Sequence, residues 1–423
     1  MMRRWLSPSI SRLARPRCLS TVAPGFHHGI ERVSVPCGSS GNVFIDLHNI
    51  AKVSSSDPLL LYLPPFSTTD PGSSIQLPKL FQSHPTAVIH YRWMTDSPHG
   101  KDLSSPGEGE SDALNARFHP GWPAPIHDTL RAYSWITENL SPATYSRRDM
   151  YVYGSYLGAS LATSLALTET HPHERMGLRG CIAYNGIYNW TMFLPDHPMN
   201  KPPKTRSAVD FLEEILEHPG DHDFEELRLE MSELFRTPED LFDPFASPCL
   251  FFHTPGLLVP PAFDASAIPT PSPLASVSPF NPDEIIEPVS TFKAQRKSPL
   301  GFPPKKSTLK IPEILLLHNS APRPPPLAPS FQRRQQRRKK DPIRNNFRTQ
   351  AEELASLMRR SINKVELKER LKWDSDFVGY NEEADRRVQV YDAGENAGFG
   401  ELAGHGDETA VRWLEDLMSS RPR

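Results

Sequence analysis

A nine-residue stretch from Tyr151 to Ala159, with the sequence YVYGSYLGA, constrains this 423-residue chain more than any other segment. A β-type run passes directly into an Ala-rich helical run, and glycines at positions 154 and 158 flank the junction. Small residues on both sides of a sharp turn let a strand and a helix approach closely. The segment therefore predicts a buried strand, a strained turn at Tyr156 and a helix that begins at once.

Apolar runs typical of strands alternate along the chain with stretches of helical periodicity. The first two predicted strands flank a Gly- and Ser-rich segment, which indicates a hairpin. The strands are expected at 31–36, 43–48, 59–63, 87–91, 150–153, 180–184, 314–317 and 387–391. The helices are expected at 125–140, 157–167, 209–216, 224–235, 346–371 and 408–418. This order predicts an α/β fold with a mostly parallel central sheet flanked by helices on both sides.

The amino-terminal 23 residues have the composition of a targeting segment. They contain five arginines and no acid, and the first carboxylate in the chain is Glu31. Such a segment is typical of a mitochondrial presequence, and Arg17-Cys18-Leu19-Ser20 resembles a matrix-peptidase site with cleavage after Leu19. We expect a mitochondrial protein, in the matrix; a disordered basic tail is the alternative. The four cysteines show no paired spacing, which favours a reducing compartment.

Several segments together resemble the α/β-hydrolase fold superfamily, in particular its esterase and lipase-like members. The turn around Tyr156 is similar to the nucleophile turn of that family, Gly-x-Ser-x-Gly. Arg117–Asp128 resembles the lead into the preceding helix, Leu61–Phe66 the strand and oxyanion loop, and Gly404–Asp407 the histidine loop. The resemblance assigns 24–254 and 311–423 to an α/β-hydrolase-like domain.

Two segments are expected to be insertions in that domain. Between Pro255 and Pro329 there are 18 prolines in 75 residues, a density that opposes both helices and central strands. We therefore expect a long Pro-rich insertion over 255–310, disordered for the most part, and a second Pro-rich and basic insertion over 320–345.

The sequence departs from the family pattern at the nucleophile itself. Aligning Gly154 and Gly158 with the family glycines places Tyr156 where the resemblance implies a serine. A phenol oxygen lies several bonds further from the backbone, so an oxyanion hole arranged for serine would be out of register. Ser155 lacks small flanking residues, and Ser160 is expected one turn inside the helix, where a packed or capping hydroxyl is the simpler interpretation.

The resemblance implies further site residues. His405, between two glycines, is the candidate general base, with a plain loop histidine as the alternative. Asp341 is the candidate acid, displaced beyond the basic insertion, with an aspartate at a helix start as the alternative. The oxyanion donors would be the amides of Leu157 and Phe66, since Pro64 and Pro65 have no N–H.

Three functions are compatible with these residues. The first is a non-catalytic binding or structural protein with a degenerate triad, which would hold a small acyl or ester ligand or a mitochondrial protein partner. The second is a carboxylic ester or thioester hydrolase with an atypical nucleophile. The third is RNA or anionic-membrane association through a basic run, for which a solvated loop is the alternative. That run comprises Arg333, Arg334, Arg337, Arg338, Lys339 and Lys340.

No cofactor or metal is expected. No glycine-rich phosphate loop follows a predicted strand, and no group of His, Cys and Asp has metal-ligand spacing.

Overall fold

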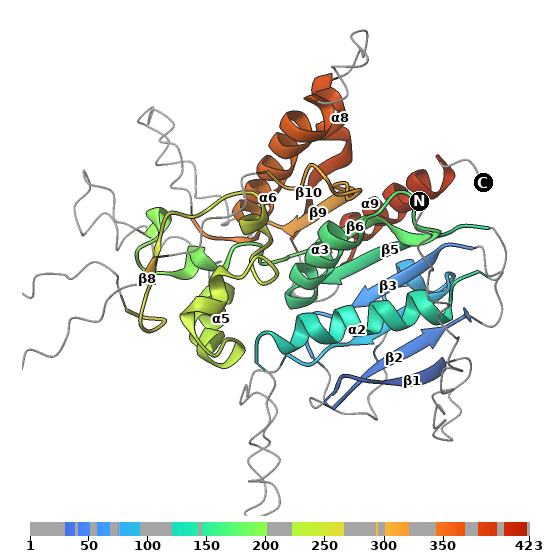
Figure 1. The fold of residues 1–423 in the computed structure, drawn as a ribbon, viewed down its shortest axis with the longest axis horizontal. Coiled ribbons are helices and arrows are strands. Elements are labelled where there is room, and N and C mark those ends of the chain that lie inside the picture. Colours follow the sequence, from blue (N-terminus) through green and yellow to red (C-terminus); the bar gives the residue numbers. More distant parts are fainter. Residues whose placement is uncertain are drawn as a thin grey trace, which may run out of the picture.

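An eight-stranded sheet forms the centre of the protein in the computed structural model (Figure 1). The structure describes residues 30–38, 41–50, 57–67, 75, 77–93, 121–142, 146–200, 222–265, 293–294, 301–320, 344–368, 380–395 and 402–420. The strands are β1 (Ile30–Pro36), β2 (Asn42–His48), β3 (Leu59–Leu63), β4 (Thr86–His90), β5 (Arg148–Ser155), β6 (Met176–Tyr184), β9 (Glu313–Asn319) and β10 (Val388–Gly394). Their order across the sheet is β1-β2-β4-β3-β5-β6-β9-β10.

Most neighbouring strands run parallel. The predicted hairpin is confirmed: β1 pairs antiparallel with β2 from Ile30 opposite His48 to Pro36 opposite Asn42. β2 also pairs antiparallel with β4, and the remaining pairs, from β4–β3 to β9–β10, are parallel. Because β5 lies between β3 and β6, the turn that follows it emerges at the centre of the sheet.

Helices cover both faces of this sheet, as the alternating pattern predicted. They are α2 (Ala124–Asn139), α3 (Leu157–Glu169), α5 (His222–Leu234), α6 (Phe347–Ser361), α8 (Tyr380–Arg387) and α9 (His405–Ser419). In β3, Leu59, Leu61 and Leu63 pack into the core shared with α2, α3 and α6. Leu60 and Tyr62 pack into the opposite core, which is closed by α9 and the 3₁₀ turn η3 (Lys79–Phe81).

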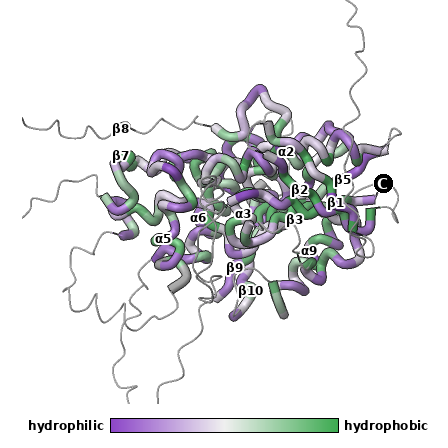
Figure 2. The backbone as a smooth tube through the Cα atoms, turned by 90° about the horizontal axis from the view of Figure 1, so that it is seen from below, coloured by the Kyte–Doolittle hydropathy of each residue, from purple (hydrophilic) through white to green (hydrophobic). Residues whose placement is uncertain are grey.

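Burial on both sides explains why the central strands are continuous apolar runs rather than alternating ones. Figure 2 shows the same distribution, with hydrophobic residues along the central strands and polar ones on the outer elements. Among the described residues, no helix combines the length and the apolar character needed to cross a bilayer.

Two carboxy-terminal elements differ from the prediction. The helix expected over 346–371 begins with an Asn346 cap, whose side chain accepts a hydrogen bond from the Thr349 amide at 2.8 Å. It ends at Ser361 and continues as a π-helical turn, η11 (Ile362–Leu367). The short helix α8 was not predicted, because it consists mainly of charged residues and carries no apolar periodicity.

The connection between β6 and β9 packs beside the carboxyl ends of the strands. It includes α5 and the 3₁₀ turns η5 (Trp190–Phe193), η6 (Pro198–Asn200), η8 (Pro238–Phe242) and η9 (Pro248–Phe251). The indole of Trp93 donates to the carbonyl of Leu234, at the end of α5, at 3.0 Å. The helix expected at 209–216 lies outside the described residues.

Parts of the expected Pro-rich insertion are among the described residues. Leu258–Val259 (β7) pair antiparallel with Lys293–Ala294 (β8). Phe302 packs against Phe251 and Phe252, with ring centroids 4.9 and 5.3 Å apart. The presequence region 1–23 and the basic run 333–340 lie outside the described residues.

Candidate functional site

The turn between β5 and α3 places Tyr156 at the apex of the candidate site. Its backbone has φ 51° and ψ −116°, a conformation that L-residues other than glycine rarely adopt. The Tyr156 amide donates to the carbonyl of Tyr184 at 2.9 Å, and the Tyr156 carbonyl accepts from the Ala159 amide at 3.1 Å. These two bonds tie the strained residue to the end of β6 and to the first turn of α3.

The two flanking glycines allow a close backbone approach. A Cβ atom at Gly154 would lie 2.3 Å from the carbonyl oxygen of Gly158. A Cβ atom at Gly158 would lie 2.4 Å from the carbonyl oxygens of both Leu63 and Pro64, at the end of β3. Neither position has room for a side chain, so the spacing of the two glycines follows from packing alone.

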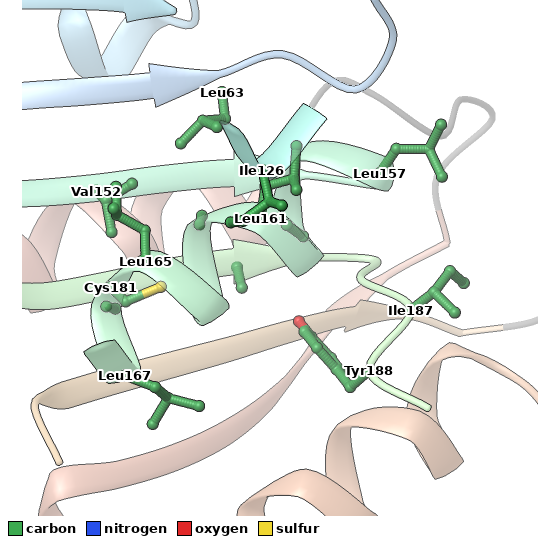
Figure 3. Close-up of a cluster of buried hydrophobic side chains, with 14 of the residues drawn as sticks. Leu63, Ile126, Val152, Leu157, Leu161, Leu165, Leu167, Cys181, Ile187 and Tyr188 are labelled. Carbon is green, nitrogen blue, oxygen red and sulfur yellow. The ribbon is translucent and has the colours of Figure 1, made fainter. Parts of the chain in front are cut away.

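The helix that follows the turn is buried along almost its whole length. α3 brings Leu161 and Leu165 into the core it shares with Leu63 and Val152 of the strands (Figure 3). Eleven consecutive residues of α3, from Leu157 to Leu167, are buried. Such a helix cannot shift without disturbing the core, so the position of Tyr156 is fixed from its carboxyl side as well.

The Tyr156 ring is enclosed by other aromatic rings. It is 6% exposed, with the Phe66 ring centroid at 5.3 Å and the Phe347 centroid at 6.2 Å. The contact continues from Phe347 to Phe224 of α5 at 4.7 Å, and from there to Phe193 at 5.5 Å. Phe66 and Phe347 thus pack against the Tyr156 ring, and Phe224 and Phe193 extend the group of aromatic rings.

Neither neighbouring serine stands in for a displaced nucleophile. Ser155 is fully buried. The hydroxyl of Ser160, also fully buried, donates to the carbonyl of Ile187 at 2.5 Å, in agreement with the packed hydroxyl expected from the sequence.

Leu157 and Phe66, the candidate oxyanion donors, both lie next to Tyr156. The Leu157 amide belongs to the first turn of α3, where helix N–H groups have no intrahelical acceptor. In the loop after β3, the Pro64 carbonyl faces Gly158 and also accepts a hydrogen bond from the Tyr91 hydroxyl at 2.6 Å. The backbone atom directed at the start of α3 is thus the Pro64 carbonyl oxygen, which is an acceptor and not a donor. Phe66 is 49% exposed.

His405 is the first residue of α9 and follows Gly404, whose φ is 56°. The side chain of His405 is exposed, and this side chain makes no hydrogen bond or ion pair with any other described residue. Asp341, the candidate acid, lies outside the described residues, so the structure does not test its pairing with His405.

The structure reveals a carboxylate that the sequence analysis missed at the same edge of the sheet. Asp392, near the end of β10, accepts hydrogen bonds from the Ser320 hydroxyl and, at 2.9 Å, from the Gly394 amide. Burial raises the pKa of Asp392, but these hydrogen bonds outweigh it and leave the pKa below its ordinary value. Ser320 and Asp392 are 72 positions apart, so no local motif could have paired them.

Asn185 is another polar residue that the sequence analysis did not select. It follows β6 with φ 49°, and its side-chain oxygen accepts from the Asn319 amide at 2.9 Å. Its buried side-chain nitrogen has no hydrogen-bond partner among the residues that the structure describes. Asn185 therefore ties the carboxyl ends of β6 and β9 together beside Tyr156.

Among the described residues, no group of three or more His, Cys, Asp and Glu side chains is arranged to hold a metal ion. The three cysteines in the described ranges, Cys37, Cys181 and Cys249, are free thiols.

Comparison with known proteins identifies similar structures but no similar sequence. No protein-family model matches the chain. No curated protein matches it either.

Three solved structures illustrate the similarity. A hyperthermophilic esterase from the archaeon Pyrobaculum calidifontis shares 12% identity over 93% of this chain and 83% of its own, with a TM-score of 0.41. Carboxyl esterase 2 from Tuber melanosporum shares 12% over 92% and 87%, with a TM-score of 0.41. A hormone-sensitive lipase from a metagenome library shares 12% over 94% and 87%, also with a TM-score of 0.41.

The protein has the α/β-hydrolase fold, as predicted. The assignment rests on the mostly parallel sheet and on the strand, strained turn and helix around Tyr156. The site therefore combines the backbone of a nucleophile turn with a phenol at its apex, enclosed by aromatic rings.

Proposed function

We propose that this chain is an α/β-hydrolase-fold protein without serine chemistry, which acts in mitochondria through binding or as a structural partner. The observation that carries the proposal is the Tyr156 ring, which occupies the apex of the turn at 6% exposure between Phe66 and Phe347. A serine nucleophile needs a small side chain with a free approach for an acyl carbon, and this apex offers neither.

The chemistry of tyrosine also opposes acyl transfer here. A phenol has an ordinary pKa near 10, so it must be activated by a nearby base or cation before it can attack. The side chain of the candidate base His405 is exposed and makes no hydrogen bond to any other described residue. We therefore propose that Tyr156 acts as a packed aromatic ring rather than as a reacting group.

A binding role uses the same position differently. Phe66 is half exposed beside the buried Tyr156 ring, so the two present an aromatic surface at the carboxyl edge of the sheet. A small acyl or ester ligand, or an apolar segment of a mitochondrial protein partner, would be recognised by this surface through apolar contact.

Activity-based labelling tests the proposal directly. The purified chain is incubated with a serine-directed fluorophosphonate probe and with short-chain aryl esters, in parallel with the variants Tyr156→Ser, His405→Ala and Ser160→Ala. We expect neither labelling nor turnover by the unmodified chain. Labelling and turnover that disappear in His405→Ala but persist in Ser160→Ala would overturn the proposal and establish a hydrolase with an atypical nucleophile.

The mitochondrial location and the basic run need separate tests. Import into isolated mitochondria, followed by sequencing of the new amino terminus, should give a chain that begins at Ser20; an uncleaved chain that stays outside would refute the location. Association of Arg333–Lys340 with RNA or an anionic membrane should weaken steeply with salt and vanish when the six cations become Gln.

A further inference from the structure

A polar groove lies at the edge of the sheet opposite to Tyr156. It has a volume of about 830 Å³ and is lined by residues just before β5, just after α3, just before β9, and on η11 and α8. Because β5 is eight residues long, this groove and the turn at Tyr156 are separated by roughly 25 Å along the strand. Its volume falls within the range of small-molecule sites in proteins.

Each acidic side chain of the groove lies beside an arginine. Glu366 pairs with Arg387 at 2.7 Å. Glu313 and Glu383 both pair with Arg386, at 3.0 and 3.1 Å. The adjacent arginine weakens the repulsion between each carboxylate and an incoming anion.

Several basic side chains of the groove have no acidic partner. Lys305 and Lys310 are exposed and form no ion pair within the described part of the chain. Arg147 is exposed too, and its guanidinium donates to the carbonyl of Pro172 at 2.7 Å. The lining contains five cationic and three acidic side chains, a local surplus of two positive charges on a chain whose net charge is −3.

The segment that carries the two lysines is held by a hydrogen bond within itself and by two to other elements of the fold. The Ser307 amide donates to the carbonyl of Pro304 at 2.9 Å, and the Lys310 amide donates to the carbonyl of Thr170 at 3.1 Å. The following amide, of Ile311, donates to the Glu366 carboxylate at 3.0 Å. The backbone is thus ordered before any ligand arrives, which lowers the entropic cost of binding.

The remaining lining defines the class of ligand. Ser307 and Thr308 add hydroxyl groups beside the lysines, a combination suited to phosphate oxygens. Pro303, Val365 and Leu367 form an apolar part, and no aromatic side chain lines the groove among the described residues, so nothing there would stack on a nucleobase. We propose that this groove binds a phosphorylated, non-aromatic small molecule, with Arg147, Lys305 and Lys310 contacting the phosphate.

Calorimetric titration of the full chain with inorganic pyrophosphate and with glycerol 1-phosphate, at constant ionic strength, tests this proposal. We expect binding of both, weakened about tenfold or more in Lys305→Gln/Lys310→Gln because two charge-assisted contacts are lost. Lys306→Gln, an exposed neighbour that does not line the groove, should change the affinity less than twofold. Thermal unfolding of each variant without ligand verifies that the fold is intact.

Four outcomes would overturn the proposal. The first is the absence of binding by the unmodified chain. The second is equal weakening in the double variant and in Lys306→Gln. The third is loss of binding when the basic run Arg333–Lys340 is changed to Gln while the groove is intact. The fourth is binding only to single-stranded RNA or to vesicles of phosphatidylcholine with cardiolipin, which would assign the groove to a macromolecular partner.

Discussion

The close contact between α3 and the end of β3 makes Gly158→Ala the most informative single substitution in this protein. The added Cβ would lie 2.4 Å from the carbonyl oxygens of Leu63 and Pro64 and 2.9 Å from the Leu63 carbonyl carbon. All three are backbone atoms, so α3 and β3 would have to separate by nearly 1 Å to restore ordinary contact. Overpacking in a closed core costs typically about 3 kcal/mol when backbone must move.

Opposing effects reduce this cost. Alanine is favoured over glycine inside a helix by about 1 kcal/mol, which includes the lower entropy of the unfolded chain. The net loss should therefore be about 2 kcal/mol, equivalent to a fall in Tm of roughly 2 °C for a chain of this size.

Differential scanning calorimetry and urea unfolding measure this loss, with Gly177→Ala as the matched control. A Cβ at Gly177 would meet its nearest atoms at 3.4 Å, which is ordinary contact, so this variant should be unchanged or slightly stabilised. If Gly158→Ala proved as stable as the control, the close approach would not constrain the turn, and the argument that packing requires this glycine would be wrong.

Three further predictions concern the free energy of unfolding. Tyr156→Ala should lower the free energy of unfolding by about 3 kcal/mol, because it removes the ring from its contacts with the surrounding aromatic rings. This loss, measured by urea unfolding, should be several times the loss from Tyr156→Phe. Burial alone would raise the pKa of Asp46, but hydrogen bonds from Arg32 and His90 hold this pKa well below its ordinary value. The stabilisation of the folded state by Asp46 is therefore complete above about pH 4 and is lost as the pH falls further, and Asp46→Asn should remove this dependence of the free energy of unfolding on pH. Burial and the nearby His253 lower the pKa of His197 to about 4, so this group favours the folded state above about pH 6.5 and destabilises it progressively between pH 6.5 and 4. In His197→Asn, the free energy of unfolding should therefore fall less between these two pH values than in the unmodified chain.

The sheet was predictable because its strands are buried on both faces and therefore consist of continuous apolar residues. β3, β5 and β6 all lie where such runs were found, α2 follows from helical periodicity, and α3 follows from its apolar, Ala-rich composition. α8 was missed because it consists mainly of charged residues, among which Ala384 is buried, so it has no apolar pattern of helical spacing. The end of α6 was placed too late, since apolar spacing continues through the π-helical turn that follows it.

The apex of the site was predictable from its two glycines, whereas its surroundings were not. Tyr156, Leu157 and Phe66 lie together as the sequence suggested, because they are close to the ends of adjacent strands. Phe347 and Phe224 come from distant helices, and their contact with each other depends on how α5 and α6 pack. The Ser320–Asp392 pair likewise depends on the parallel register of β9 and β10.

Under the proposed function, the backbone geometry of the turn at Tyr156 is maintained without a catalytic side chain. A non-glycine residue in such a conformation costs about 1–3 kcal/mol. Complete burial of a large apolar ring contributes about 1.5–3 kcal/mol, and the contacts with Phe66 and Phe347 add to it. The two magnitudes are similar, so the enclosed ring offsets the strain that in a hydrolase is maintained for catalysis. Packing of an aromatic residue at the apex therefore helps to preserve the junction between β5 and α3, and with it the core around α3.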